Sequence, residues 1–559
     1  MSTEVADLAA VSIRSHSASP ATVRSVWLTA AGRSPGVELL SWPPDMFAFT
    51  DVVLDRTEAY RFAVSPPADR EWPPTPPAGW REALETAAQR WSEWAGEPLG
   101  DPPDVIVREW RVLRDALDLS LDEIASGRAW RVCQALLTLH AIADEACAGV
   151  AIGTGTRDET GASSRTRMRE LLTETGTIAR LDPARLRILP KYRTAPGGIT
   201  SRSISRYASV TGPRVDYRVH RGTTTSGDSA RDHMNVLLLP WPLRVSADDF
   251  QPVAGSVLER DIEPFGFFRF EPSDPFDVPL VDRVLSTALE GDGRIDAVVL
   301  PESSVPEQDL ARLEAVLSRH DVPMLIAGLR DGSGIGNSSA SNWVHFGLAV
   351  DGQWRHWRQD KHHRWSLDRS QIEQYHLEQV LDLRVRWWES IDINPRSVEM
   401  LELDTGDTIA SLVCEDLAHI DDVIELLRAV GPTLVVALLL DGPQLASRWA
   451  ARYASVLADN PGSAVLTLTS YGMVANAWQA GRPPSSVVAL WKDNARALHE
   501  IKLDADAQAI LLRLERQPGI RRAADGRLPK HDATDLRLAA VTQVRAEETA
   551  SKPSGHGTS

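Results

Sequence analysis

Lysine is scarce in this chain of 559 residues. Lysine and arginine together number 60, yet only six of these residues are lysine. They are Lys191, Lys361, Lys492, Lys502, Lys530 and Lys552. A lysine ammonium is a compact point charge with a tunable pKa, which a guanidinium does not imitate. Lys361, within Trp-Arg-Gln-Asp-Lys-His-His and just after a glycine-containing turn, therefore marks a position that needs an ammonium.

Cysteine and long apolar runs are also rare. The three cysteines, Cys133, Cys147 and Cys414, cannot form a disulfide framework, and their spacings are not those of a zinc site. Cys133 and Cys147 fall in helical patterns and are predicted to be buried core thiols. No apolar run is long enough to span a membrane, and the N-terminus lacks the pattern of a signal peptide. We expect no membrane partner and a reducing, cytoplasmic location.

Acidic residues outnumber basic residues in this chain. The formal net charge of −17 argues against a general phosphate-binding surface, which requires a basic stripe. Two local features point the other way. The segment 118–125 resembles the second helix of a helix-turn-helix, and 202–206 forms a basic patch. A solvated helix face explains the first feature equally well, so nucleic-acid binding is not favoured.

The pattern of apolar and polar residues changes near Met234. Before it, 1–75 is mixed and ends in a proline-rich stretch, 80–150 has helical periodicity, and 151–232 is polar with one short helix near 167–175. After it, short apolar runs alternate with amphipathic segments. The sequence thus predicts three parts: a mainly helical region of unknown function (1–232), an α/β domain (233–519) and a disordered tail (520–559).

Within the α/β domain, strands and helices alternate in an order typical of a mixed sheet with covering helices. Strands are expected at 235–240, 295–300, 323–328, 344–350, 353–358, 400–403, 408–414, 433–440, 464–469, 487–491 and 497–503. Helices are expected at 279–289, 307–319, 421–430 and 444–458. Asp351-Gly352 is a strong hairpin turn signal between two of the strands.

Three residues whose side chains are suited to catalysis lie at the ends of these predicted strands. Glu302 ends a buried strand, where partial burial would raise its pKa and suit it to accept a thiol proton. Lys361 follows a hairpin strand and would stabilise a developing oxyanion. Cys414 ends another strand where helix-forming sequence resumes; backbone N–H groups and a nearby ammonium would lower its thiol pKa.

Glu302, Lys361 and Cys414, in this order and in these contexts, resemble the Glu-Lys-Cys triad of the carbon–nitrogen hydrolase (nitrilase) superfamily. The resemblance extends over about 233–505: Asn342 precedes the hairpin, and 448–460 resembles the family's arginine-rich helix, followed by a strand and Ser-Tyr-Gly at 470–472. It implies an α-β-β-α sandwich that usually pairs with a second copy. It also implies that Glu302 is the general base, Lys361 the oxyanion stabiliser and Cys414 the nucleophile of an acyl-thioester mechanism.

The resemblance further implies a second glutamate shortly after the lysine. Glu373 is the candidate, with Glu378 behind it. The family's usual run after the lysine is replaced here by His-His-Arg-Trp-Ser-Leu-Asp at 362–368, and the stretch up to Cys414 is longer, with Trp-Trp-Glu inserted at 387–389.

The sequence gives weaker support to a zinc site and to a Cys–His dyad. His362 and His363 are adjacent, so on a strand they would point to opposite faces, and no carboxylate pattern completes a zinc site. His419 invites a Cys–His dyad but is more plausibly a helix cap, and Glu415 and Asp416 are expected to stabilise the start of that helix. We expect no cofactor and no metal.

The leading functional hypothesis is an amidase-type cysteine hydrolase acting on a small amide, with nitriles or carbamoyl compounds as further substrates, in a homo-oligomer. Acyl transfer is a second enzyme hypothesis. A third is that the α/β domain is a signalling or interaction module regulated by the N-terminal region.

Overall fold

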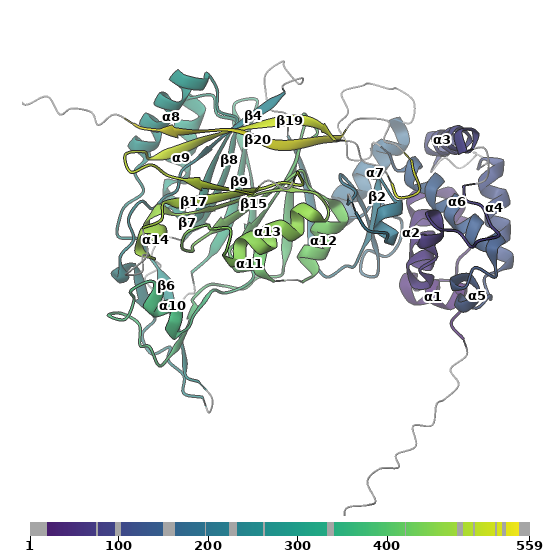
Figure 1. Ribbon diagram of the computed structural model, residues 1–559, viewed down its shortest axis with the longest axis horizontal. Helices are drawn as coiled ribbons and strands as arrows, with labels where there is room; N and C mark the ends of the chain where they lie inside the picture. Colours follow the sequence, from purple (N-terminus) through teal and green to yellow (C-terminus); the bar gives the residue numbers. More distant parts are fainter. Residues whose placement is uncertain are drawn as a thin grey trace, which may run out of the picture.

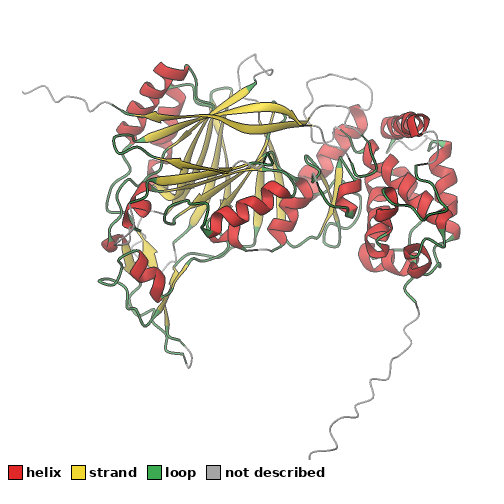
Figure 2. Cartoon of the chain, in the orientation of Figure 1, coloured by secondary structure: helices red, strands yellow, loops and turns green. Residues whose placement is uncertain are grey.

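The computed structural model describes residues 20–73, 77–95, 102–148, 162–195, 197–222, 232–260, 263–331, 340–419, 421–477, 484–495, 498–519, 523–527 and 533–546. No helix in these stretches is long and apolar enough to cross a membrane. Residues 1–19 and 547–559 lie outside them. A bundle of helices lies at one end of the molecule, and the large sheets, flanked by further helices, lie at the other (Figure 2).

The N-terminal helices form a bundle around one central helix. They are α1 (Val23–Ala31), α2 (Pro43–Thr57), α3 (Pro77–Trp94), α4 (Asp104–Asp115), α5 (Leu121–Ala125) and α6 (Trp130–Ala146). Helices α2, α3 and α4 pack against α6, which is buried on almost every side (Figure 1). Helices α1 and α2 lie in the stretch before residue 75, for which the sequence pattern had suggested no individual elements. The prolines at 43 and 44 begin α2, because proline is tolerated in the first turn.

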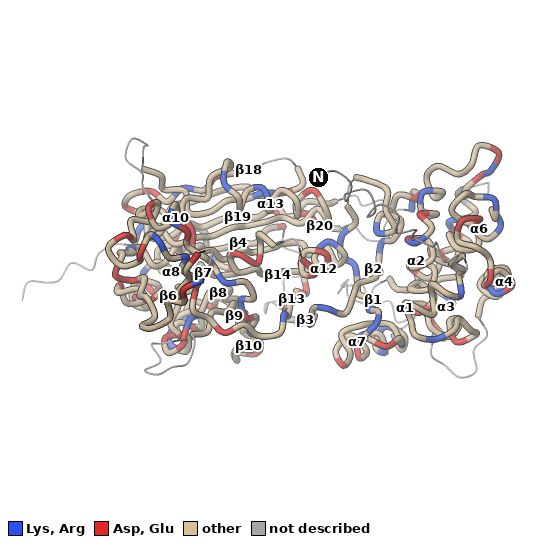
Figure 3. Tube along the Cα trace, turned by 90° about the horizontal axis from the view of Figure 1, so that it is seen from below, with Lys and Arg blue, Asp and Glu red and all other residues tan. Residues whose placement is uncertain are grey.

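Neither the segment 118–125 nor the basic patch at 202–206 forms a basic surface that could contact nucleic acid. Helix α5 is a single turn whose Ile124 is buried in the bundle. In the basic patch, Arg206 is buried against Glu145, and Arg202 pairs with Glu425. Acidic and basic residues are intermixed along the chain (Figure 3).

The first large sheet has the order β10-β9-β8-β7-β4-β19-β20. Its strands are β4 (His233–Leu238), β7 (Ala297–Pro306), β8 (Met324–Arg330), β9 (Asn342–Val350), β10 (Gln353–Asp360), β19 (Ala509–Gly519) and β20 (Ala533–Val544). Side chains alternate between its faces, as the period of two requires. Val298 and Leu300 pack with helices α8 (Val278–Asp292) and α9 (Leu310–Arg319), whereas Val299 joins the main core.

The second large sheet has the order β18-β17-β16-β15-β14-β13-β3. Its strands are β3 (Asp216–Gly222), β13 (Ser397–Leu403), β14 (Thr408–Val413), β15 (Leu434–Leu439), β16 (Ala464–Thr469), β17 (Val487–Lys492) and β18 (Leu498–Lys502). Strands β14 and β15 contact β9 and β7 of the first sheet, so both sheets share the main core. Helices α11 (Glu415–Ala418), α12 (Asp422–Val430), α13 (Trp449–Asp459) and α14 (Tyr471–Asn476) belong to this half (Figure 1).

Smaller elements complete the fold. A four-stranded sheet has the order β11-β12-β6-β5 and a small core of its own. The remaining elements are β5 (Phe250–Pro252), β6 (Phe265–Phe270), β11 (Ser366–Leu367), α10 (Arg369–Gln374), β12 (Arg386–Glu389), α7 (Ala162–Thr175), β1 (Arg187–Pro190), β2 (Ala208–Thr211) and the 3₁₀ turns Val37–Ser41, Ala59–Ala63, Ser201–Ile204, Ala247–Asp249 and Glu307–Asp309.

The mixed α/β class is confirmed, and so are the hairpin across Asp351-Gly352 and the strand pair on either side of 404–407. Two predicted boundaries were wrong. Strand β3 pairs in parallel with β13, so the second sheet begins before residue 232. Strand β20 pairs with β19, so the predicted disordered tail contains an edge strand. Both strands are polar and exposed along one side, and periodicity alone did not separate them from loops.

Candidate functional site

Lys361 lies directly after β10, at the end of the β9–β10 hairpin. Its backbone N–H donates to the carbonyl of Asn342, which begins β9, so the hairpin presents both residues at one end. Gln359, two residues earlier, donates to the carbonyl of Ser411 on β14, which ties this strand to the second sheet. The Lys361 side chain is only 1% exposed. It is therefore a buried cation, which is rare unless the ammonium is paired.

Glu302 lies in a bulge of β7. The pairing of β7 with β8 shifts register between Leu300 and Val305, and Ser303 has a positive φ of 52°. The bulge lies directly over Gly328 of β8: a Cβ at that position would be 2.3 Å from the carbonyl oxygen of Pro301 and 2.4 Å from the Cα of Glu302. A glycine at 328 is therefore required to bring the Glu302 backbone this close to β8.

Two carboxylates share the Lys361 ammonium. Lys361 Nζ donates to Oε1 of Glu302 at 2.7 Å and to Oε2 of Glu389 at 2.5 Å. The Asn342 side-chain amide donates to the same two residues, at 2.8 Å each. Glu302 Oε2 is buried and accepts no hydrogen bond from the described residues. The network therefore fixes one oxygen of Glu302 and leaves the other available to accept a proton.

Cys414 sits at a sharp strand-to-helix turn. It follows β14 and precedes α11, and its backbone has φ 42° and ψ −106°, a conformation that non-glycine residues rarely adopt. Its N–H donates to the carbonyl of Leu438 and its carbonyl accepts from Leu417, so both sides of the turn are held. Such strain persists only where the surrounding structure enforces it, and it concentrates at functional sites.

The charges of this group are coupled. Burial raises the pKa of Cys414, Glu302 raises it further, and Lys361 opposes this rise. Burial also raises the pKa of Glu302, against the attraction of Lys361. Burial by itself would lower the pKa of Lys361, but Glu302 and Glu389 raise it well above its ordinary value. The expectation of a lowered thiol pKa was therefore wrong, because desolvation outweighs the ammonium. Burial and the nearby carboxylate of Glu302 thus both favour the neutral thiol form of Cys414.

Asp416 links the cysteine turn to the lysine loop. Its carboxylate accepts from the backbone N–H groups of His362 and His363, at 3.3 and 3.0 Å, and its Oδ1 lies 2.9 Å from Nδ1 of the His363 imidazole. Its side chain is only 4% exposed. The structure thus gives Asp416 a role beyond the expected helix start: it anchors the segment that follows Lys361.

The carboxylate that lies against Lys361 together with Glu302 is that of Glu389, and Glu373 lies elsewhere. Glu373 lies on α10, where its half-exposed carboxylate pairs with Arg369, and Glu378 is exposed. Glu389 ends β12, whose pairing with β6 and β11 carries it to Lys361. The Trp-Trp-Glu stretch that looked like an insertion thus supplies the buried carboxylate. No strand was expected at 386–389, so nothing in the sequence analysis singled out Glu389.

The other cysteines and His419 do not join this group. Cys133 and Cys147 are buried, as predicted, and burial raises the pKa of Cys133 to about 11. The His419 ring stacks on His363 with centroids 3.8 Å apart, and the closest carboxylate oxygen to its Nε2 is on Glu415 at 3.9 Å.

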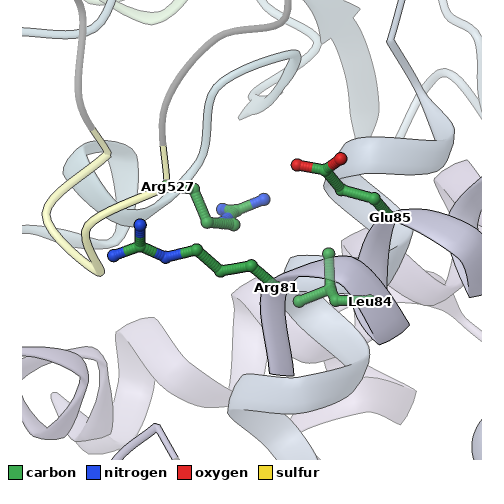
Figure 4. Close-up of a pocket in the computed structure, with 4 residues that line it drawn as sticks. All are labelled: Arg81, Leu84, Glu85 and Arg527. Atoms are coloured by element: carbon green, nitrogen blue, oxygen red, sulfur yellow. The ribbon is translucent and has the colours of Figure 1, made fainter. Parts of the chain in front are cut away.

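A separate cavity lies between the N-terminal bundle and the C-terminal segment 523–527. Arg81, Leu84 and Glu85 of α3 line it together with Arg527, and its volume is about 160 Å³ (Figure 4). Arg527 is itself held by Asp144, Glu145 and Asp525, so this cavity is a feature of the junction between the bundle and the strand-rich half.

Comparison with solved structures finds matches of low sequence identity. Saccharomyces cerevisiae Nit3, a member of branch 10 of that superfamily, is 11% identical, with 52% of this chain and 93% of that chain covered and a TM-score of 0.33. The C. elegans NitFhit protein is 12% identical, with 51% and 61% covered and a TM-score of 0.34. An N-terminal amidase bound to a Gln-Gly peptide is 9% identical, with 37% and 48% covered and a TM-score of 0.22.

No protein-family model and no curated protein matches the chain.

Proposed function

We propose that this chain is a cysteine hydrolase of the carbon–nitrogen hydrolase type, cleaving the non-peptide C–N bond of a small amide, nitrile or carbamoyl compound. The observation that carries the proposal is the buried ammonium of Lys361, shared by Glu302 and Glu389 and coupled to Cys414. A buried ion group of this kind costs desolvation energy and contributes little net stability, so a chemical role accounts for it better than folding does.

In the proposed reaction, the thiol of Cys414 gives its proton to Glu302 as sulfur attacks the carbonyl carbon. Glu302 Oε2 is the acceptor, because Oε1 is occupied by Lys361 and Asn342. The oxyanion that forms is stabilised by the Lys361 ammonium. The tetrahedral species then collapses, the C–N bond breaks, and the protonated Glu302 gives its proton to the leaving amine. The acyl group remains on sulfur as a thioester.

Water completes the turnover. Glu302 again takes a proton as water attacks the thioester carbon. The C–S bond then breaks, Glu302 returns this proton to the sulfur of Cys414, and the carboxylic acid is released. Glu389 touches the ammonium rather than the proposed reacting atoms, so we assign it as a positioning residue. It holds Lys361 between two carboxylates and keeps it protonated.

The surroundings of Cys414 carry charges of both signs. Glu302, Glu415 and Asp441 raise the thiol pKa, whereas Lys361 lowers it, and Asp441 is itself paired with Arg448.

The α-β-β-α arrangement of the family is part of the proposal. It is supported by the shared core between the two large sheets and by the packing of α8 and α9 against one of them and α13 against the other. Homo-oligomer formation stays a prediction from the resemblance.

Intact-protein mass spectrometry after incubation with an amide library tests the proposal. We expect a covalent acyl adduct on the wild-type chain that Cys414→Ala abolishes. Glu389→Gln should slow its formation by about tenfold to a hundredfold, the worth of a hydrogen bond to a charged group. Glu373→Gln is the matched control, with a half-exposed glutamate, and should leave the rate unchanged.

If no amide, nitrile or ester gives an adduct, and a thiol-directed electrophile also fails to label Cys414 while the chain remains folded, the hydrolase proposal is wrong. An interaction module would then be the better account of the domain.

A further inference from the structure

A second cluster of ligand-type side chains lies on the opposite face of the hairpin that carries Lys361. Along β9, Val344 and Phe346 join the main core, whereas Trp343 packs on the side of helices α8 and α9. His345 shares the face of Trp343 by the two-residue alternation. On β10, His356 lies directly across from Gly347, on that same face. Helix α9 covers it and contributes Glu314.

The three side chains converge on one point. Glu314 Oε1 lies 3.2 Å from Nε2 of His345 and 3.2 Å from Nδ1 of His356. One ligand atom from each of the three residues lies within 4.8 Å of the other two. Ligands bound at about 2.0–2.1 Å to a tetrahedral zinc ion are separated by about 3.3 Å. The two observed separations match that edge length.

The local backbone leaves space beside the ligand atoms. A Cβ at residue 347 would lie 3.1 Å from Nε2 of His345 and 3.0 Å from the indole of Trp354. Glycine at 347 therefore keeps the ligand nitrogen of His345 uncovered. The side chains of His345 and Glu314 are 5% and 10% exposed, whereas that of His356 is 49% exposed. His345 and Glu314 are thus held inside the protein, whereas His356 faces solvent. An ion can enter from that side, and a water molecule can occupy the fourth coordination position.

We propose that His345, His356 and Glu314 bind a divalent ion of the zinc class. Two imidazole nitrogens and one carboxylate oxygen suit such an ion better than Mg²⁺ or Ca²⁺, which prefer oxygen ligands. The site ties α9 to the hairpin. His345 is three residues from Asn342 and His356 is five residues from Lys361, so the ion would stiffen the element that holds the ammonium in place. The proposal does not depend on the hydrolase function.

Without an ion, the same arrangement is two imidazole N–H groups donating to one carboxylate oxygen. Glu314→Gln separates the two cases, because an amide oxygen still accepts those hydrogen bonds but is a much poorer metal ligand. His356→Gln removes the exposed ligand with little risk to folding. His499→Gln is the matched control, since His499 is an exposed histidine on β18 of the other sheet.

The test is titration of the untagged, chelator-treated full chain with Zn²⁺, and with Co²⁺ as a spectroscopic probe. All variants are made in a Cys414→Ala background, so that the reactive thiol cannot bind the metal. We expect one ion per chain, an affinity at least tenfold weaker in Glu314→Gln and in His356→Gln, and an unchanged affinity in His499→Gln. Bound Co²⁺ should show no thiolate charge-transfer band.

Hydrogen exchange supplies a second readout. Zn²⁺ should slow the exchange of amides in 342–361 in the parent chain but not in His356→Gln. The proposal is overturned if the parent chain binds no stoichiometric ion. It is equally overturned if both ligand variants bind as tightly as the parent, since the ion would then lie elsewhere.

Discussion

The sharpest consequence of the buried network is the effect of removing its one cation. In Lys361→Met, the aliphatic part of the side chain is kept and the ammonium is lost. Glu302 and Glu389 then face each other in a buried space with only Asn342 between them. Both carboxylates lose their ion pair at once.

The size of the effect follows from the geometry. Two unit charges about 4 Å apart interact by about 4 kcal/mol at an effective dielectric constant of about 20. Removing one partner of a buried pair costs about 3–5 kcal/mol in measured cases, because a buried charge is left uncompensated. Two pairs break here, but one carboxyl can take up a proton, which limits the loss. We expect Lys361→Met to lower the free energy of unfolding by about 3–5 kcal/mol near neutral pH.

The sign of the pH dependence follows from the carboxyl groups. Without Lys361, burial and repulsion by Glu389 hold the pKa of Glu302 above that of the unfolded chain. The folded variant then binds more protons than the unfolded one, so its stability falls as pH rises through the pKa of Glu302. The deficit relative to wild type should therefore be larger at about pH 8 than at about pH 6.

Urea unfolding of the full chain, followed by circular dichroism at both pH values, measures this. Lys502→Met is the matched control, because Lys502 is exposed on β18 and its loss should change stability by less than about 0.5 kcal/mol. In Lys361→Met/Glu389→Gln, removal of one carboxylate should restore about 1–3 kcal/mol. The reasoning is refuted if Lys361→Met is as stable as Lys502→Met, or if its deficit grows towards acid pH.

Three further predictions concern neighbouring parts of the site. Gly328→Ala places a methyl group against the Glu302 bulge, so it should cost about 1–3 kcal/mol and slow adduct formation about a hundredfold. Gly291→Ala, in open space on α8, should do neither, and equal effects in mass spectrometric rates would contradict this. Asp416→Asn should lower stability by about 1.5–3 kcal/mol and speed hydrogen exchange in 361–365; unchanged exchange there would show that Asp416 does not anchor the loop. Because burial raises the pKa of Cys414, its alkylation by iodoacetamide should keep accelerating above the ordinary thiol pKa, whereas a plateau below that value would contradict the assignment.

The triad candidates could be selected from sequence because each follows a recognisable strand pattern, although the structure continues β7 past Glu302 to Pro306. Apolar runs before Glu302 and Cys414 and the Asp351-Gly352 turn before Lys361 are local signals, and the structure brings Glu302 and Lys361 into hydrogen-bond contact. Glu389 carried no comparable signal. It reaches Lys361 because the short strand β12 pairs with β6, more than a hundred residues earlier in the chain.

The prediction of a lowered pKa for Cys414 was wrong for a related reason. From the sequence, an ammonium and a helix start beside the thiol predicted a lowered value. The structure shows a thiol that is 2% exposed, with three carboxylates acting on it. Desolvation is a property of everything packed around a group, so it is not visible in the residues next to that group in the chain.

Local sequence, then, determined the α/β class, most strands and helices, the hairpin that ends at Lys361 and the scarcity that makes this lysine conspicuous. These follow from periodicity, turn residues and composition, which act over a few residues. Tertiary structure alone decided that Glu389 shares the ammonium, that Asp416 holds the loop after it, that β3 and β20 extend the sheets, and that two histidines meet Glu314 behind the hairpin. Each depends on strand register and packing between distant segments. Lys361 illustrates both cases, since the scarcity of lysine is visible in the sequence, whereas the residues that contact Lys361 are determined by the fold.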